Sequence, residues 1–325
     1  MVVEADESDG TFIKIPTQIG VVTNIDPEHL DYFGSVERMH QEYETFFRNV
    51  PFYGLAVTCI DHPVARDMIE RLGLRRDGRR LLTYGVAPDA DLRLLSARVE
   101  GTHTIFDAEL SDRVGGGARR IEGWAVPVPG EHNALNALAA IAVCAETGLS
   151  DCAIETSLAR FAGVKRRFQP TGTWNGITIY DDYGHHPVEI AAVLKAARQA
   201  GARDVVAVVQ PHRYSRLHSL FEEFCTCMND AGTVIVADVY AAGEQPIEGI
   251  DKDALVEGLR ARGHRSVVPL PGPDSLPEMI HAIARSGDYV VCLGAGNITA
   301  WAHALPGQLT DLQQRARGRL AGAMK

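Results

Sequence analysis

The residues best suited to chemistry stand together in one short stretch, Asp181-Asp182-Tyr183-Gly184-His185-His186-Pro187. This stretch follows the β-prone run 177–180 and precedes a helical pattern that Pro187 opens. A strand-to-helix loop lies at the carboxyl end of its strand, which is where an open α/β sheet keeps its chemistry. The sequence therefore predicts a site with carboxylates and imidazoles on one loop. The alternative is a turn whose Asp residues only cap the next helix.

A second group of carboxylates lies near the start of the chain. The short apolar run 1–3 leads directly into Glu4-Ala5-Asp6-Glu7-Ser8-Asp9, and the next strand, 19–25, leads into Asp26-Pro27-Glu28-His29. Carboxylates at the carboxyl end of an apolar strand are a usual way to hold Mg²⁺. Glu4 and His29 are one strand–loop–strand unit apart, so we expect both to face one crevice. The alternative for His29 alone is an ordinary loop residue.

Two further motifs carry groups that could bind a ligand. Asn133 and Asn136 lie three residues apart at the start of an Ala-rich helix, so their amides share a face and could bond an adenine edge or a phosphate. Helix capping explains Asn133 equally well. Arg213 and Arg216, in the run Gln210-Pro211-His212-Arg213-Tyr214-Ser215-Arg216, could grip a carboxylate or phosphate, or could simply be solvated.

The elements that must position these residues divide the chain into two α/β parts. In the first part the sequence predicts a helix capped by Ser35, a parallel-type strand at 55–60, a helix begun by Pro63 and antiparallel hairpins between 81 and 128. Helices follow, from the Asn motif to Gly148 and at 151–162. After a hinge at 163–168 with three cations, strands near 177–180, 205–209, 233–237 and 289–293 alternate with helices. That alternation predicts a second α/β domain with a mostly parallel, Rossmann-like sheet.

Composition limits the classes of protein that the chain can represent. With 325 residues, 46% apolar and 23% charged, it is long enough for two globular domains. The net charge of −10 argues against a nucleic-acid surface, and the Arg-rich run 75–80 is expected to be a solvated loop. No stretch is apolar and long enough for membrane insertion, and no signal peptide is visible. Six cysteines without CxxC spacing indicate reduced core residues and a cytoplasmic location.

Taken together, the motifs resemble one family, the Mur ligases. Six of them occur in that family's order: Glu-Ala-Asp-Glu-Ser-Asp at 4–9, Thr-Asn-Ile with Glu-His-Leu-Asp at 23–31, His-Asn-Ala-Leu-Asn at 132–136, Arg-Arg-Phe at 166–168, Asp-Asp-Tyr-Gly-His-His-Pro at 181–187, and Gln-Pro-His-Arg-Tyr-Ser-Arg at 210–216. The resemblance covers nearly the whole chain. It is strongest to the members that join L-alanine to UDP-N-acetylmuramate in peptidoglycan synthesis, with the ligase that recycles murein tripeptide as the second choice.

The resemblance implies an ATP-dependent reaction through an acyl phosphate, with UDP-N-acetylmuramate and L-alanine as substrates. It implies Glu4 and His29 as Mg²⁺ ligands and Asn133 and Asn136 as nucleotide-binding residues. Arg167 would neutralise phosphate charge and Asp182 would meet the nucleotide. The same resemblance places five residues on the substrate and amino-acid side: Tyr183, His185, His212, Arg213 and Arg216. Glycine or serine as the amino acid stays open, because no single residue identifies a methyl pocket.

One feature of the family is missing from the sequence. The family holds the ATP phosphates with a G-x-x-x-x-G-K-[ST] loop that follows a UDP-binding domain, and neither occurs in this chain. We therefore expect residues 1–163 to be an incomplete central ATP-binding domain and residues 164–325 the C-terminal, amino-acid-binding domain. Such a chain would have little activity without the missing N-terminal half.

Two readings of other classes also remain open. One is a metal-dependent hydrolase built from Asp181, Asp182, His185 and His186, because clusters of carboxylate and imidazole bind Zn²⁺ or Mn²⁺. The other is a binding module without catalytic activity.

Overall fold

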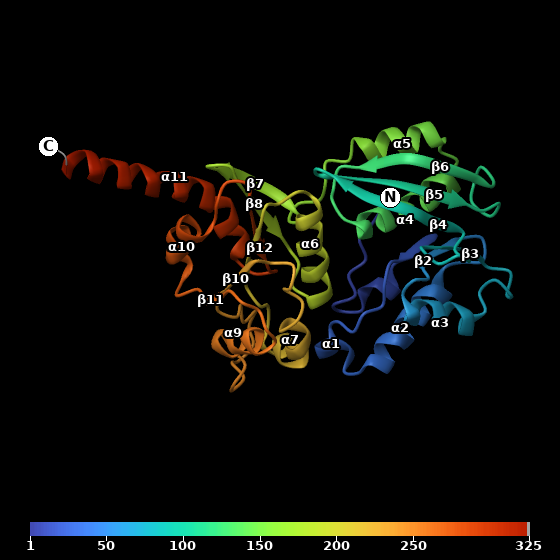
Figure 1. The fold of residues 1–325 in the computed structure, drawn as a ribbon. Coiled ribbons are helices and arrows are strands. Elements are labelled where there is room, and N and C mark those ends of the chain that lie inside the picture. Colours follow the sequence, from blue (N-terminus) through green and yellow to red (C-terminus); the bar gives the residue numbers. More distant parts are fainter. Residues whose placement is uncertain (324–325) are drawn as a thin grey trace. The chain divides into compact units, whose positions relative to one another are not determined.

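The chain forms two compact units, each built around its own six-stranded sheet (Figure 1). The computed structural model describes residues 1–323, except for the side chains of residues 30, 31 and 317–323. The first unit holds Met1–Arg98, His103–Pro127 and Glu131–Phe161. The second holds Val99–Thr102, Val128–Gly130 and the residues from Ala162 onward. Among the described residues, no helix is both long and apolar enough to span a bilayer.

The first unit combines parallel strands with an antiparallel pair, as the sequence predicts. Its strands follow one another across the sheet in chain order: β1 (Ile19–Val22), β2 (Leu55–Cys59), β3 (Arg80–Gly85), β4 (Leu92–Glu100), β5 (His103–Leu110) and β6 (Arg119–Val126). β1 to β4 pair in parallel, and β5 pairs with β6 antiparallel. The expectation of hairpins from residue 81 onward was wrong for β3, which pairs in parallel with β2. Residues 81–85 are all buried, as is typical of a strand covered on both faces.

Helices cover both faces of this sheet. They are η1 (Thr11–Lys14), α1 (Leu30–Phe33), α2 (Val36–Asn49), α3 (Pro63–Leu72), α4 (Glu131–Glu146) and α5 (Asp151–Ala159). Two predicted starts are confirmed, since Ser35 caps α2 by accepting from the backbone N–H of Arg38 and α3 begins at Pro63. The capping role considered for Asn133 was wrong, because α4 begins at Glu131 and Asn133 lies inside its first turn. α2 and α3 share one core, and α4 packs against β2 and β3.

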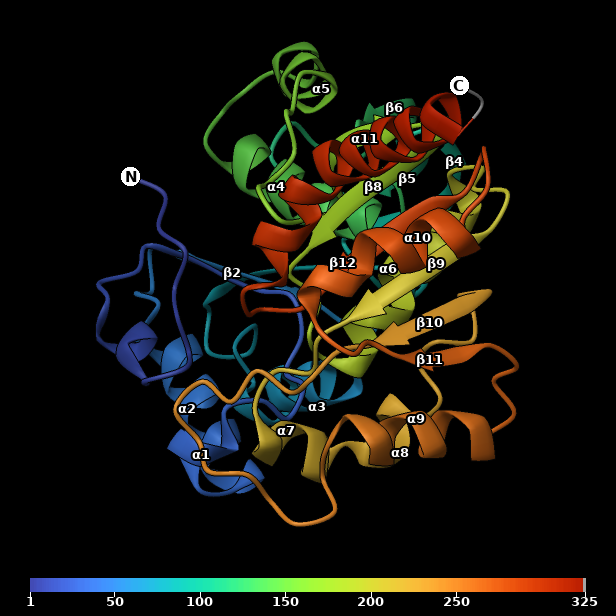
Figure 2. The ribbon, with the colours of Figure 1, turned by 90° about the vertical axis from the view of Figure 1, so that its left-hand side faces the viewer.

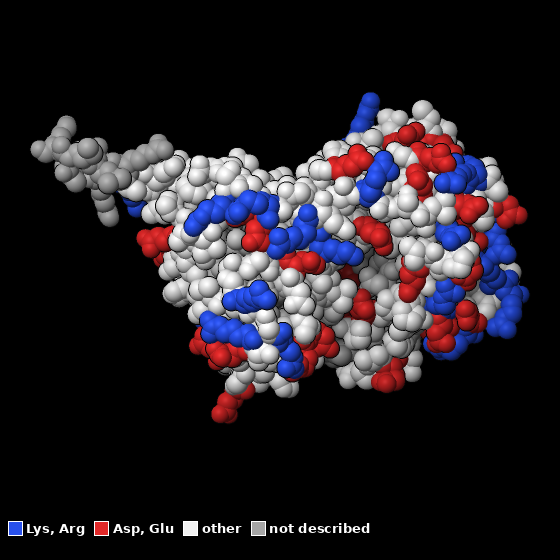
Figure 3. Space-filling view, in the orientation of Figure 1, with Lys and Arg blue, Asp and Glu red and all other residues white. Residues whose placement is uncertain are grey.

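The Arg-rich turn at residues 75–80 is exposed, as expected, but it also has structural contacts. Arg75 pairs with the buried carboxylate of Asp91, and Arg80 forms a two-pronged ion pair with Glu146. Arg79 donates to the carbonyl oxygens of residues 48 and 50, at the end of α2. In Figure 3, Lys and Arg side chains on this unit lie beside Asp and Glu side chains.

The second unit has a mostly parallel sheet, which confirms the predicted Rossmann-like architecture. Its strands are β7 (Gln169–Trp174), β8 (Ile177–Asp182), β9 (Val205–Val209), β10 (Thr233–Val236), β11 (Val267–Pro269) and β12 (Tyr289–Leu293). They lie in the order β11-β10-β9-β12-β8-β7, and only β7 runs antiparallel to its neighbour. Its helices are α6 (Pro187–Gln199), α7 (Tyr214–Ser219), α8 (Phe221–Phe224), α9 (Lys252–Ala261), η2 (Pro273–Ser275), α10 (Leu276–Ile283) and α11 (Ile298–Ala323).

Figure 2 shows strands β8 to β12 of this sheet. Two hydrophobic cores fill its two faces. Side chains alternate between faces along a strand, so Val205, Ala207 and Val209 enter one core while Val206 and Val208 enter the other. Helices α6 to α9 cover the first face, and α10 and α11 cover the second. Strands buried on both faces read as continuous apolar runs, which is why these were recognisable in the sequence.

The three central strands of the second unit end level with one another. In the register of the parallel pairs, Leu293 of β12 lies opposite Asp182 of β8 on one side and Val209 of β9 on the other. The loops that follow these strands therefore leave the sheet on the same side, at the carboxyl ends of the strands.

Candidate functional site

Within the second unit, hydrogen bonds of Asp182 connect the loop after β8 to the hinge at 163–168. Asp182 is the last residue of β8 and only 1% exposed. One carboxylate oxygen accepts from the backbone N–H of Phe168 and the other from that of Gly184, each at 2.7 Å. Burial raises the pKa of Asp182 to about 6, although both N–H donors act in the opposite direction. A Cβ on Gly184 would lie 2.8 Å from the carboxylate, so only glycine allows this approach.

His186 caps the helix that follows, so the reading of Asp181 and Asp182 as helix caps was wrong. The Nδ1 atom of His186 accepts from the backbone N–H of Val188 at 3.4 Å, and Pro187 occupies the first turn of α6. Glu189 closes the capping box by accepting from the backbone N–H of His186. This spacing of three residues was visible in the sequence, but His is not among the usual capping residues.

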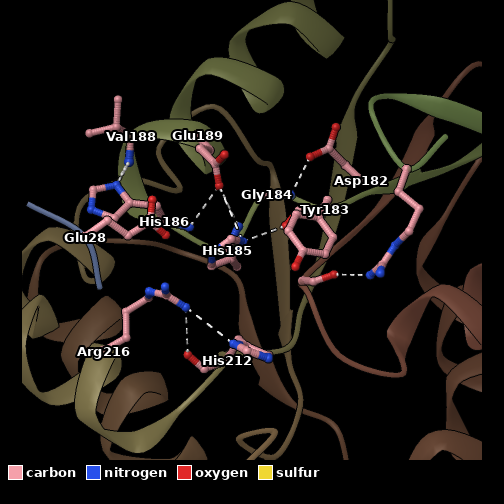
Figure 4. A network of polar contacts seen from close by, with 12 residues as sticks. Glu28, Asp182, Tyr183, Gly184, His185, His186, Val188, Glu189, His212 and Arg216 are labelled. Atoms are coloured by element: carbon pink, nitrogen blue, oxygen red, sulfur yellow. Dashed lines mark hydrogen bonds and ion pairs between the residues drawn. The ribbon is translucent and has the colours of Figure 1, made fainter. Parts of the chain in front are cut away.

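Glu189 is a site residue that the sequence reasoning missed. Its carboxylate accepts from the backbone N–H of His185 at 3.1 Å (Figure 4). It also accepts from the guanidinium of Arg167 at 3.1 Å. Burial acts to raise the pKa of Glu189, but His185 and Arg167 outweigh burial and the net pKa is lowered. The ionised carboxylate therefore holds two of the predicted site residues in place.

The proton position on His185 follows from its neighbour. Its Nδ1 atom lies 2.9 Å from the carbonyl oxygen of Tyr183, which can only accept a hydrogen bond. In the neutral ring the proton is therefore on Nδ1, and Nε2 is the acceptor. Tyr183 is partly exposed and lies under the guanidinium of Arg166, 4.6 Å from the ring centre.

The Gly294-Ala295-Gly296-Asn297 loop after β12 holds this arginine. Arg166 donates to the carbonyl oxygens of Gly294 at 2.8 Å and Gly296 at 3.4 Å. The side-chain amide of Gln210 donates a hydrogen bond to the side-chain oxygen of Asn297, and its oxygen accepts one from the backbone N–H of Ile298. Gly294-Ala295-Gly296 has the spacing of the first two glycines of a dinucleotide-binding fingerprint. In this loop, however, the glycines present carbonyl oxygens to a cation, whereas that fingerprint presents N–H groups to phosphate.

His212 and Arg216 face each other after β9 (Figure 4). The guanidinium of Arg216 lies 3.4 Å from both Nδ1 and the carbonyl oxygen of His212. Burial, helped by the nearby charges of His185, Arg216 and Arg213, lowers the pKa of His212 to about 4. His212 is therefore neutral at pH 7, with Nδ1 accepting and the proton on Nε2. The His212 ring centre is 5.8 Å from that of His185, so the loops after β8 and β9 meet.

The hydrolase reading is not supported by this geometry. Asp182 is occupied by backbone N–H donors, and the fully buried Asp181 accepts from the hydroxyl of Thr299. In the described part of the chain, Asp181, Asp182, His185 and His186 do not form a group of potential metal ligands. The residues that do are in the first unit.

Glu7, Glu28 and His29 form the candidate metal site of the first unit. Their ligand atoms all lie within 4.8 Å of one another, and Nε2 of His29 is 3.5 Å from Glu7 and 3.9 Å from Glu28. Two carboxylates beside one imidazole suit a divalent cation, and the hard oxygens suit Mg²⁺. The sequence pointed to His29 and Glu4, but Glu4 is exposed and outside this group.

Other predicted polar residues of the first unit lie on the loop after β1 and in α4. His62, the N-cap of α3, lies 3.1 Å from the carboxylate of Asp26 in the loop after β1. Asn133 and Asn136 both lie in the first two turns of α4; the amide of Asn133 contacts His132 at 3.1 Å and Asn136 is exposed. Their spacing on one helix face agrees with the sequence, and their role remains a prediction.

Comparisons with known proteins agree with this arrangement. Residues 1–144 match the family described as Mur ligase middle domain, and residues 166–296 match the family described as Mur ligase, glutamate ligase domain. The chain is 62% identical to a UDP-N-acetylmuramate–L-alanine ligase of Granulibacter bethesdensis, over 97% of this chain and 65% of the relative. It is 61% identical to the protein of the same name in Acidiphilium cryptum, over 100% of this chain and 67% of the relative.

A solved structure shows the same fold. The crystal structure of a UDP-N-acetylmuramate-alanine ligase from Thermotoga maritima has a TM-score of 0.72 and is 23% identical. The match covers 96% of this chain and 63% of that chain. This chain thus spans about two thirds of the length of the relatives that it matches.

Proposed function

Because the chain belongs to the Mur ligase family, we propose that it serves the ATP-dependent joining of L-alanine to UDP-N-acetylmuramate in peptidoglycan synthesis. In this reaction the carboxylate of the sugar acid becomes an acyl phosphate, and the amine of L-alanine displaces the phosphate. A carboxylate is a poor electrophile until one oxygen becomes a leaving group, so the protein mainly positions groups and neutralises charge. Residues 1–163 would act as the ATP-binding domain and residues 164–325 as the amino-acid-binding domain.

The main support for this proposal is that the loops after β8 and β9 come together in the second unit. Glu189 holds Arg167, which would neutralise phosphate charge, and the same carboxylate holds His185. Nε2 of His185 is an acceptor that could receive a proton of the attacking amine. Arg213, the N-cap of α7, and Arg216, within α7, follow the neighbouring strand β9 and suit the carboxylate of an amino acid. One edge of the sheet thus offers groups for an amine, a carboxylate and a phosphate.

The first unit would hold the nucleotide and its cation. Glu7, Glu28 and His29 fit Mg²⁺ by their ligand types, and Glu4 remains a candidate on the same segment. Bound Mg²⁺ would neutralise charge on the phosphates. Asn133 and Asn136 would contact the nucleotide through their amides.

Calorimetric titration of the chain with L-alanine, and separately with Mg·ATP, tests this proposal. We expect both ligands to bind, and Arg216→Ala to abolish the heat of L-alanine while leaving that of Mg·ATP. Arg262→Ala is the matched control, because this arginine is half exposed, lies at the C-terminal end of α9 and pairs with Glu222. A chain that binds neither ligand would be a scaffold, and the ligase proposal would be wrong.

Phosphate release measures turnover separately from binding. With ATP, UDP-N-acetylmuramate and L-alanine present, phosphate release should depend on L-alanine if these residues carry the complete reaction. The sequence contains no G-x-x-x-x-G-K-[ST] loop, so we expect little release from this chain alone. Rapid release that depends on L-alanine would contradict that expectation and support the ligase activity.

A further inference from the structure

The segment Tyr240–Glu244, which follows β10, is bonded to the loop after β9 at both of its ends. At one end, the backbone N–H of Tyr240 donates to Pro211 at 2.8 Å, and its carbonyl accepts from the backbone N–H of Arg213 at 2.9 Å. At the other end, the carboxylate of Glu244 accepts from the backbone N–H of Ser215 at 3.0 Å and from its hydroxyl at 2.6 Å. None of the sequence motifs includes this segment.

Glu244 supplies a cap that α7 lacks. The residue before this helix, Arg213, has a positive φ of 71° and offers no side-chain cap. A residue other than glycine is strained at this φ, so contacts with its surroundings must hold the backbone of Arg213 there. Glu244 satisfies an N–H of the first turn, and its pKa is lowered because the Ser215 bonds and Arg213 outweigh the effect of burial. The carboxylate is thus ionised and fixes the start of the helix that carries Arg216.

Tyr240 fixes the ring of His212. The two rings are nearly parallel, at 11°, with their centres 5.5 Å apart. Arg216 donates to Nδ1 of the same imidazole, so the ring is held on one face and at one edge. The backbone makes room for this stack, because a Cβ on Gly296 would lie 2.6 Å from the Tyr240 ring.

We propose that Tyr240 and Glu244 are positioning residues that keep the loop 211–216 in its ligand-binding form, with His212 neutral and its proton on Nε2. The inference rests on the proposed function, in which this loop receives the amino acid. Neither residue needs to touch the ligand. They order Arg213, His212 and Arg216 before the ligand binds, so that this ordering does not add to the entropic cost of binding.

Nitrogen-15 NMR of the histidine side chains in the full chain, without ligand, tests the positioning directly. In the wild type we expect His212 to show a single neutral tautomer with the proton on Nε2. Glu244→Ala and Tyr240→Ala should each give signals averaged between tautomers. Glu244→Gln should largely restore the wild-type spectrum, because its amide oxygen still accepts from Ser215. Glu257→Ala, at an exposed position of α9, is the control.

Titration with L-alanine gives the second readout. Glu244→Ala should weaken binding roughly tenfold, as expected when a preorganised loop must be ordered during binding. A wild-type tautomer signal in both alanine variants, or unchanged affinity beside a lower melting temperature, would overturn the inference and leave a purely structural role. If the wild type itself does not bind L-alanine, the amino-acid assignment fails, while the NMR spectra still decide whether Tyr240 and Glu244 position His212.

Discussion

Replacement of Asp182 by asparagine should change how the stability of the second unit depends on pH. The pKa of this carboxyl is about 6 in the folded chain against an ordinary value of 3.8, because it is buried. A pKa raised by folding means that the stability from this group is complete below the ordinary value and is lost as the pH rises through about 6. The difference of about two pKa units corresponds to about 3 kcal/mol of lost stability at neutral pH.

The variant removes this titration and adds a cost that does not depend on pH. Asparagine keeps one acceptor oxygen, so either the N–H of Phe168 or that of Gly184 loses its partner. A buried N–H left without a partner costs about 1–3 kcal/mol. We therefore expect Asp182→Asn to be the less stable protein at about pH 4, and to gain roughly 2–3 kcal/mol on the wild type by about pH 7.

Urea unfolding followed by tryptophan fluorescence measures this difference. Trp174 and Trp301 belong to the second unit, so a Trp124→Phe background reports on that unit alone. Asp204→Asn, at a half-exposed carboxylate that directly precedes β9, is the control for an Asp-to-Asn change elsewhere in the same unit. A difference between variant and wild type that stays constant from acid to neutral pH would refute the raised pKa of Asp182.

Two further predictions concern the loop after β12 and the metal group. Gly296→Ala should destabilise the second unit by roughly 1–3 kcal/mol, because the new Cβ would lie 2.5 Å from the side chain of Gln210. Gly307→Ala in α11 is the control: its new Cβ would meet nothing within 4 Å, so it should be neutral or stabilising. Thermal melting of both variants measures the difference. Glu28→Gln should weaken Mg²⁺ binding roughly tenfold in calorimetric titration, because it removes one of two charged oxygens beside His29. Glu44→Gln, which pairs with Arg71 on the same unit, should leave Mg²⁺ affinity unchanged.

The sequence predicted the elements of the second unit well because their signals are local. Continuous apolar runs marked β9 and β12, and Pro187 marked the start of α6. The same signal was available for β3, whose residues 81–85 are all buried, but the alternating runs after it led to an antiparallel assignment. Strand direction depends on partners that are distant in sequence, so pattern alone left it undecided.

Side-chain contacts were harder to predict than loops. The acidic segment 4–9 has no regular structure through residue 7, so no periodicity indicates which carboxylate turns toward His29. The structure brings Glu7 there and leaves Glu4 exposed. Glu189 escaped notice because its partners, Arg167 and the His185 backbone, come together only once the hinge lies against α6.

The position of β12 has a consequence for how the second unit assembles during synthesis. β8 and β9 follow one another in the chain but are not neighbours, because β12 is inserted between them. A nascent chain that has emerged only through residue 280 contains β8 and β9 but not β12, the strand that lies between them. The loops carrying His185 and His212 therefore reach their final spacing only after residues 289–293 are available, so this half of the site should form late and in a single step.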